Sequence, residues 1–462
     1  VILCSFWTLL LFAQNGNSLI EVTDLLKIKT AGNITVNKEG SKAAFTVTSI
    51  EALPTSKSDY RYVTQLYSID LAKGAKPVQL THAKESASSP AWSPDGSQLA
   101  FVRTAEGRPQ IFILPLNGGE AWQLTTGSRG AVNPKWSPDG SRILFTSSVS
   151  FKDLLKDSLL NPAGDFPIWP MEKPGLTTAD LKRAAGSRPN PNGNMDQVRA
   201  YLLANEADGK ATVLNKLNFQ DEANISSNMS FAQFYTIEVK PAAQPKPILT
   251  GFARYSAVEF TPDGKRLVLG ARMDSLEHPD RTLESEIYMA DADGKNLRLL
   301  LGKKGMSYSG AAVSPSGKWI AYQFGTIEVD VPSLAIMPLD GKESDAITIP
   351  FDRNKGGFTW SADEKALYFT AQSNGGSPLY RLTIATKKVE QLSSFDAGIS
   401  YFGLGRNGIL FTKTEVANPS EVYFGDAALK ETARLTDLNN WVQAKKLSFP
   451  EKKTFVNSKG QT

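Results

Sequence analysis

Cysteine and histidine are nearly absent from this chain of 462 residues, which contains one cysteine, Cys4, and two histidines, His82 and His278. Cys4 lies in a segment that we interpret below as part of a signal peptide. After cleavage of that segment, no disulfide, thiolate metal site or cysteine nucleophile can form. Two histidines alone supply too few ligands for a zinc site. Both stand in polar sequences, QLTHAKE and LEHPDRT. We therefore expect surface imidazoles, because no positioned serine accompanies either of them.

The chain also lacks a strong charge of one sign. Its 51 basic and 47 acidic residues give a formal net charge of +4, which is too small and too dispersed to indicate a nucleic-acid partner. Acidic turns such as DADG, Asp291 to Gly294, lack the spacing and terminal glutamate of a calcium-binding loop. We expect no metal, no cofactor and no nucleic-acid partner.

A long hydrophobic run occurs only at the amino terminus, as VILCSFWTLLLFAQ, Val1 to Gln14. It is too short to span a bilayer stably, and it has a small residue, Ala13, where a signal peptidase could cut. We interpret residues 1–13 as part of a signal peptide. An exported bacterial protein, periplasmic or secreted, with no membrane span in its mature form is the expectation.

Turn-forming residues, in contrast, are abundant and recur in a repeat. PAWSPDGSQLAFVR, Pro90 to Arg103, returns as PKWSPDGSRILFTS, Pro134 to Ser147. Proline, aspartate and glycine in this order favour a tight turn, and the strand that follows is apolar on both faces. Including weaker copies, the turn position occurs at Gly40, Gly96, Gly140, Gly264, Gly317, Glu364 and Gly408.

The spacing of these seven turns predicts an all-β fold, a seven-bladed β-propeller with four-stranded blades. All intervals but one lie between 44 and 56 residues, the length of one propeller blade. A second strand pair follows most turns, as in QIFILPLNGGEAWQLT, Gln110 to Thr125. The first and last copies each contain both their inner and their outer strands. No strand from one end of the chain is therefore left over to complete a blade at the other end. We expect a seam between the end blades that is held by packing alone.

The exceptional interval, Gly140 to Gly264, carries roughly 75 extra residues. We interpret residues 151–230 as an irregular insertion in the third blade, with short helical patterns at Thr177 to Ala185 and Met195 to Glu206. The alternative is an eighth, degenerate blade whose turn is EADGKATVL, Glu206 to Leu214. The insertion is favoured because no second strand pair accompanies that turn.

Together these features resemble the propeller portion of a prolyl oligopeptidase-family serine peptidase, in the bacterial dipeptidyl-peptidase and acylaminoacyl-peptidase branch. The resemblance rests on the short helix EVTDLLKIK (Glu21 to Lys29), the seven turns, the exit segment TARLTDLNNWVQAKKLSFP (Thr432 to Pro450) and the phrase LLANEADGKATVLNKLNFQDE (Leu202 to Glu222). It implies residues 14–30 as an N-terminal helical segment, 31–440 as the propeller, and 441–462 as the start of a linker to an α/β-hydrolase domain absent from this chain.

The resemblance implies a substrate-gating domain of an exported serine exopeptidase that hydrolyses short peptides. The chain itself has no catalytic residues to assign, because GMSYSG, Gly305 to Gly310, only approaches the Gly-x-Ser-x-Gly nucleophile turn. Glu206 and Glu222, in the insertion, are candidates for holding a peptide's free amino terminus; ordinary solvated carboxylates are the other interpretation. A free-standing TolB-like periplasmic propeller that binds a protein partner is the alternative function.

Overall fold

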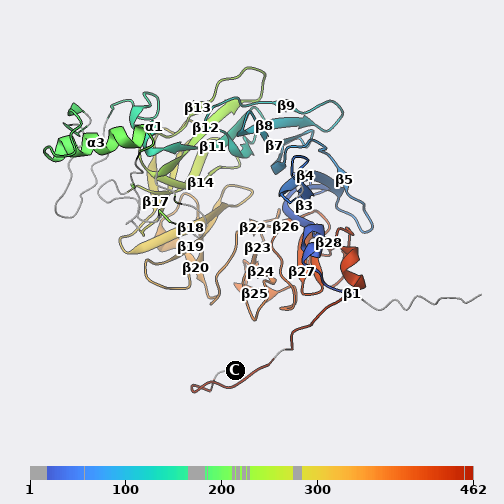
Figure 1. The fold of residues 1–462 in the computed structure, drawn as a ribbon. Helices are drawn as coiled ribbons and strands as arrows, with labels where there is room; N and C mark the ends of the chain where they lie inside the picture. The colour runs from blue at the N-terminus through green and yellow to red at the C-terminus, as the bar shows by residue number, and fades with distance from the viewer. Residues whose placement is uncertain are drawn as a thin grey trace, which may run out of the picture.

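The computed structural model describes residues 18–56, 58–164, 183–184, 186–210, 214, 219–220, 225, 229–273, 283–451 and 453–460. Within these ranges, seven four-stranded antiparallel sheets follow one another along the chain. They form a ring in which the first blade lies beside the last (Figure 1). The predicted seven-bladed propeller is therefore confirmed.

In every sheet the strands are ordered as they occur in the sequence. Blades 1 to 4 consist of β2 (Thr30–Val36), β3 (Lys42–Ala52), β4 (Tyr60–Asp70) and β5 (Val78–Gln79); β6 (Ala87–Trp92), β7 (Gln98–Ala105), β8 (Arg108–Pro115) and β9 (Trp122–Gln123); β10 (Val132–Trp136), β11 (Arg142–Ser150), β12 (Ser230–Glu238) and β13 (Lys246–Pro247); and β14 (Arg254–Phe260), β15 (Arg266–Arg272), β16 (Glu286–Asp291) and β17 (Arg298–Leu301).

Blades 5 to 7 follow the same plan. They consist of β18 (Met306–Val313), β19 (Trp319–Thr326), β20 (Ser333–Pro338) and β21 (Ile347–Ile349); β22 (Thr359–Trp360), β23 (Ala366–Thr370), β24 (Leu379–Thr383) and β25 (Lys388–Gln391); and β26 (Phe402–Leu404), β27 (Ile409–Glu415), β28 (Asn418–Gly425) and β29 (Thr432–Arg434). Short 3-10 helices are η1 (Val22–Lys27), η2 (Glu343–Asp345) and η3 (Asn440–Ala444). The helical segment expected at Glu21 to Lys29 is thus the 3-10 helix η1.

The recurring turn is a hydrogen-bonded unit. In blade 2 the Asp95 carboxylate accepts hydrogen bonds from the Ser93 hydroxyl (2.5 Å) and the Ser97 amide (3.1 Å). Asp139 does the same with Ser137 (2.5 Å) and Ser141 (3.0 Å) in blade 3. Gly96 closes the turn with φ 72°, a conformation that favours glycine. The Ser and Asp of the repeat are thus turn chemistry.

The tryptophan of the repeat joins neighbouring blades. The Trp136 indole of blade 3 donates a hydrogen bond to the Ala91 carbonyl of blade 2 (2.9 Å). Trp92 donates to Thr35 of blade 1 (3.1 Å), and Trp360 to Ala312 of blade 5 (3.0 Å). Each bond reaches the innermost strand of the preceding blade, so in these three blades the tryptophan before the turn serves blade-to-blade packing.

The hydrophobic core consists of seven clusters, one between each pair of neighbouring blades. Phe101 of blade 2 packs against Leu66 of blade 1, whereas its neighbour Ala100 packs against Phe145 of blade 3. Alternate residues of one strand therefore enter different clusters, because side chains of a strand alternate between its two faces. This explains why the strand after each turn is apolar on both faces.

The insertion lies between the second and third strands of blade 3. β11 and β12 pair along their whole length, from Arg142 opposite Glu238 to Ser150 opposite Ser230. The described part contains α1 (Phe151–Lys156) and α3 (Met195–Ala207), which lie outside the ring (Figure 1). The helix expected around Met195 to Glu206 is confirmed, and the turn proposed for an eighth blade begins in α3. Most of the Thr177 to Ala185 pattern lies outside the described residues.

A glutamine of the third strand links the third and fourth strands within each of the first two blades. In blade 2, Gln110 accepts a hydrogen bond from the Thr125 hydroxyl (2.6 Å) and donates to the Gly127 carbonyl (2.7 Å). In the same blade the Gln123 amide donates to the Thr125 carbonyl (2.7 Å). In blade 1, Gln65, Gln79 and Thr81 make the corresponding bonds.

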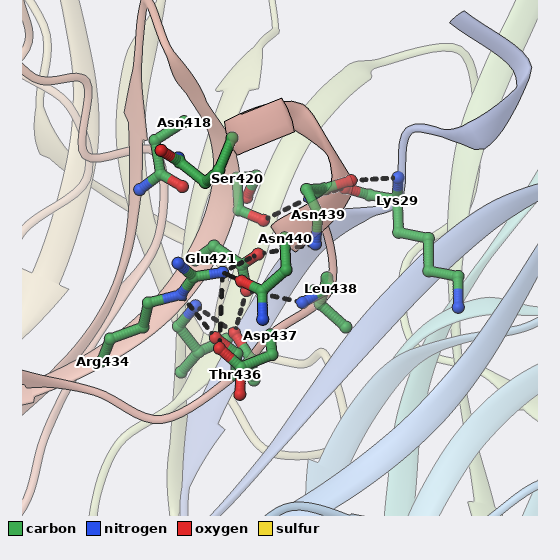
Figure 2. A network of polar contacts seen from close by, with 12 residues as sticks. Lys29, Asn418, Ser420, Glu421, Arg434, Thr436, Asp437, Leu438, Asn439 and Asn440 are labelled. Atoms are coloured by element: carbon green, nitrogen blue, oxygen red, sulfur yellow. Dashed lines mark hydrogen bonds and ion pairs between the residues drawn. The ribbon is translucent and has the colours of Figure 1, made fainter. Parts of the chain in front are cut away.

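Blade 7 replaces both glutamines with charged residues (Figure 2). Glu421, which is fully buried, accepts from Arg434 (2.7 Å) and the Thr436 hydroxyl (2.5 Å). It also accepts from the backbone amides of Leu438 (3.0 Å) and Asn439 (2.8 Å). A carboxylate has only acceptors, so this side chain binds backbone N–H groups of the departing chain, where Gln110 binds a carbonyl.

The seam between blades 7 and 1 is closed by more than apolar packing. None of the described strands is exchanged between the end blades, as predicted, and Phe424 of blade 7 packs against Phe45 and Ile69 of blade 1 within one cluster. In addition, the Asn439 side chain accepts from the Lys29 amide (2.9 Å) and donates to the Lys29 carbonyl (2.9 Å). The expectation of packing alone was therefore wrong, because the chain leaving the ring binds the chain that approaches it.

Outside the ring, a short parallel pair joins β1 (Ser18–Leu19) to β30 (Lys445–Lys446). Asp24 in η1 is almost fully buried and forms ion pairs with Lys27 (2.8 Å) and Lys445 (2.7 Å). The Glu21 amide and these two lysines hold the pKa of Asp24 well below its usual range. The segments before and after the propeller are thus fastened to each other.

Candidate functional site

A cavity of about 470 Å³ lies where the innermost strands of the first four blades converge. Its wall consists mainly of residues of β2, β6, β10 and β14, and it also includes Leu144, Phe145 and Thr146 of β11, Phe234 of β12, and Tyr401 next to β26. The Tyr401 ring lies next to Gly32, so a Cβ atom added at Gly32 would come within 3.2 Å of the ring. A small residue at this point leaves room for the aromatic ring at the wall.

Three bulged residues shape this wall, namely Asn33, Ser89 and Asn133, each with positive φ (46°, 52° and 55°). The strand register shifts at each of them. A bulge leaves one residue unpaired and bends its strand, so backbone groups of β2, β6 and β10 are left out of the ladder beside the cavity. Each bulge precedes its turn glycine by seven residues, a periodic signal that pattern reading of the sequence missed.

Lys135 is the charged residue among the described residues of the cavity wall. Its ammonium group donates to the Val258 carbonyl (3.0 Å) and to the Glu259 carboxylate (2.9 Å), which ties β10 to β14. The rest of the lining is neutral and combines hydroxyl and amide side chains with apolar ones. The described lining residues offer hydrogen bonds and apolar contact to a ligand.

The chain ends and the insertion belong to one face of the ring. Because successive strands of a blade alternate in direction, the chain enters β2, leaves β29, and connects second to third strands at the same side. We name this side the terminal face. Exposed apolar side chains occur at its strand connections: Tyr60, Tyr62, Leu283, Ile327, Val329, Val331 and Val416. Apolar residues that gather on one face indicate a contact surface.

The base of the insertion is fastened to this face. The Asp157 carboxylate, just after α1, forms an ion pair with Arg129 (2.6 Å) in the connection before β10. Asp157 also accepts from the Leu159 and Leu160 amides (both 2.8 Å), and the Gly251 amide donates to the Leu160 carbonyl (2.9 Å). The first residues of the insertion therefore have a fixed position beside the third and fourth blades.

The two predicted site residues are not tested by this structure. Glu206 belongs to the last turn of α3, and its side chain is outside the described part of the chain, as is Glu222 altogether. His82 is exposed and His278 lies outside the described residues. The segment Gly305 to Gly310 lies in strand β18 from Met306 onward. No group of three or more histidine, cysteine or acidic side chains in the described ranges is placed to hold a metal ion.

Comparison with known proteins agrees with this architecture. The family model of the TolB β-propeller domain matches residues 39–154. Dipeptidyl-peptidase 5 of Porphyromonas gingivalis is 22% identical over 408 residues, covering 86% of this chain and 53% of that protein. The chain thus spans about half the length of this curated relative.

Two solved structures share the fold. Acylaminoacyl peptidase of Pyrococcus horikoshii superposes with a TM-score of 0.60 at 16% identity, over 91% of this chain and 54% of that one. The β-propeller domain of the trilobed protease of Pyrococcus furiosus, described as having an open velcro topology, gives 0.55 at 13% identity, over 90% and 98%. The predicted resemblance to propeller portions of the prolyl oligopeptidase family is therefore confirmed. No helix in the described part of this chain is both long and apolar enough to cross a membrane.

Proposed function

We propose that this chain is the substrate-gating propeller of an exported serine exopeptidase that hydrolyses short peptides. The observation that carries the proposal is the kinship with dipeptidyl-peptidase 5, which extends over 86% of this chain but 53% of that protein. A propeller matched to the first part of a peptidase leaves the hydrolytic chemistry to a following α/β-hydrolase domain.

The geometry of the terminal face supports a docking role for it. Val329 is fully exposed and Val416 is 61% exposed, in connections of blades 5 and 7, and Tyr62 near the start of β4 in blade 1 is 73% exposed. An exposed apolar rim of this kind is stabilised when a second domain covers it. Since the chain leaves the ring at this face, fastened there by Glu421 and Asn439, a following domain would pack on it.

The cavity supports selection by size. At about 470 Å³ it falls within the volume range of small-ligand sites, so a short peptide fits and a folded protein does not. Glu206 and Glu222 are proposed to hold the free amino terminus of the peptide, since paired carboxylates bind an ammonium group by charge-assisted hydrogen bonds. Binding one end of a substrate fixes where it is cut.

The hydrolytic function is tested by reading the DNA downstream of codon 462 and assaying the complete product. We expect an in-frame α/β-hydrolase domain with a Gly-x-Ser-x-Gly turn and activity on dipeptide p-nitroanilides that a fluorophosphonate abolishes. A stop codon directly after codon 462, or a complete product without serine-dependent hydrolysis, contradicts the proposal.

The role of the two glutamates is tested in the same complete protein. Replacing both with glutamine should raise KM for dipeptide reporters with a free amino terminus by tenfold or more, about 1.4 kcal/mol in transition-state binding. The value for N-acetylated reporters should not change. Equal effects on the KM of both reporters would contradict the role of the two glutamates in binding the amino terminus, but not the peptidase function.

A TolB-like periplasmic propeller that binds a protein partner is the second candidate. It is favoured by one specific observation, the match of the TolB propeller model to residues 39–154. This candidate requires no hydrolase domain in the gene, so the downstream sequence separates it from the first.

A further inference from the structure

A second binding feature lies between blades 1 and 2 on the terminal face. Arg103, in β7, is half-buried, and its side chain makes no hydrogen bond and no ion pair with the described residues. Its Nε is buried without a partner. Burial lowers the pKa of Arg103, and Glu85 opposes this electrostatically without pairing with it. A buried N–H group without an acceptor costs free energy.

Blade 7 has a second cation at the same place in its sheet. In blades 1, 3, 4, 5 and 6 the residue seven positions after the turn residue is neutral, namely Val47, Ser147, Ala271, Phe324 and Ala371. In blade 7 the counterpart is Lys413, which pairs with Glu421 as Arg103 pairs with Gln110, and its ammonium group lies 4.6 Å from the ring centroid of Tyr423. Lys413 also forms an ion pair with Glu415 (3.0 Å), whereas the Arg103 side chain has no carboxylate partner among the described residues.

Two aromatic rings hold the guanidinium in place. Its centre lies 5.0 Å from the centroid of Phe101 and 5.3 Å from that of Phe112. Contacts of this kind stabilise a cation without using its N–H groups. The N–H donors therefore remain available, and their planar arrangement matches the two oxygens of a carboxylate.

Arg103 is set back from the rim of the terminal face. β7 and β8 continue two residue pairs beyond Arg103, to Ala105 opposite Arg108, which is about 7 Å of strand. On blade 1 the β3–β4 hairpin extends to Ala52 opposite Tyr60. A broad protein surface resting on these hairpins stays above Arg103, whereas a flexible chain end can reach it.

We propose that Arg103 is a binding site for the terminal carboxylate of a short peptide. The choice of a peptide as ligand rests on the proposed function; the preference for a carboxylate rests on the unpaired guanidinium, its aromatic support and the position of Arg103 back from the rim. Such a site would retain peptides by their free carboxyl end, at a place distinct from the cavity between the innermost strands.

The test observes the arginine directly, in this chain without any peptidase domain. With ¹⁵N-labelled arginine, the Nε–H resonance of Arg103 is identified by its loss in Arg103→Gln. Addition of Gly-Ala-Ala should shift this resonance with millimolar saturation, and Gly-Ala-Ala-amide at the same concentration should give less than a tenth of the shift. Equal shifts from both peptides, or none from either, would overturn the proposal.

Two variants of this chain, and the complete protein, provide further tests. Glu85→Gln removes the competing carboxylate and should tighten binding of Gly-Ala-Ala several-fold, while Arg103→Lys, which cannot bind in a bidentate manner, should weaken it several-fold. Unchanged affinity in both variants contradicts the site.

The complete protein gives a separate test. If the Arg103 resonance in the complete protein is already shifted and insensitive to the peptide, a carboxylate of the following domain occupies the site and the proposal fails. Hydrolysis is not measured, so this failure is separate from failure of the proposed function.

Discussion

Glu421 and Arg434 form an ion pair of 2.7 Å at the positions that glutamines occupy in blades 1 and 2. Arg434 keeps the glutamine's bond to the threonine carbonyl (2.6 Å to Thr436). Glu421, however, can only accept, and it binds the amides of Leu438 and Asn439. The substitution of charge for amide therefore changes which backbone groups of the following chain the blade can hold, and it does so in the blade after which the chain leaves the ring.

Replacing Glu421 with glutamine should destabilise the exit segment. The amide nitrogen of glutamine is a donor, so either Leu438 or Asn439 would face a donor and lose its acceptor. A lost hydrogen bond to a buried charged group corresponds to about 1.5–3 kcal/mol. We expect a fall of this size in the free energy of unfolding and faster hydrogen exchange at the Leu438 and Asn439 amides.

The double variant Glu421→Gln with Arg434→Gln is the matched control for charge. It recreates the neutral pair of blade 2, so blade 7 should regain its internal bonds while the two exit amides still exchange rapidly. Slow exchange at Leu438 and Asn439 in the double variant would show that the exit segment is not held by the carboxylate of Glu421.

Replacing Asn439 with alanine should loosen the seam. The Lys29 amide and carbonyl would both lose their partner, with an expected cost of about 1–3 kcal/mol. Hydrogen exchange should rise in β2 and β29 and remain unchanged in β14 and β15 on another side of the ring. The control is Asn440→Ala, whose side chain contacts the exposed edge of Arg434; equal effects from both variants would contradict a specific role for Asn439.

Replacing Trp136 with phenylalanine should weaken the contact between blades 2 and 3. The ring is largely preserved, but the Ala91 carbonyl loses its donor, so we expect the unfolding free energy to fall by about 1 kcal/mol beyond the effect of size. Trp122→Phe in the same cluster is the control, because no hydrogen bond of its indole nitrogen is present in the described structure. Urea titration of both variants measures the difference, and identical losses would exclude a contribution from the indole bond.

The repeat turns should respond to acid. Hydrogen bonds, chiefly from Ser93 and Ser97, lower the pKa of Asp95 to about 2, and those from Ser137 and Ser141 do the same for Asp139. The unfolded carboxyl titrates near about 3.9. This stabilisation is therefore present above pH of about 4 and is lost as the pH falls toward 2.

The variant Asp95→Asn with Asp139→Asn should accordingly have a lower urea midpoint than the parent at pH 7, with a difference that narrows at pH 2.5. Asp70→Asn, at the exposed end of β4, serves as the control and should change the midpoint little at either pH. A difference that stays constant between pH 7 and 2.5 would mean that the turn carboxylates do not contribute through their ionised form.

The sequence by itself determined the repeat. Turn chemistry at Gly96 and Gly140 and apolar residues on both faces of the next strand are local properties, so the number of blades, the order of strands and the place of the insertion could be predicted from them. These features need only neighbouring residues and a fixed period.

The tertiary structure alone decided the seam, the cavity and the unpaired arginine. Asn439 meets Lys29 across 410 residues, and no local pattern encodes which distant backbone groups lie within hydrogen-bond reach. The bulges at Asn33 and Asn133 become a cavity wall only when four blades converge. Arg103 has the sequence context of any strand residue. Its lack of a partner follows from what the neighbouring blade presents to it, because pairing depends on positions in space that ring closure fixes.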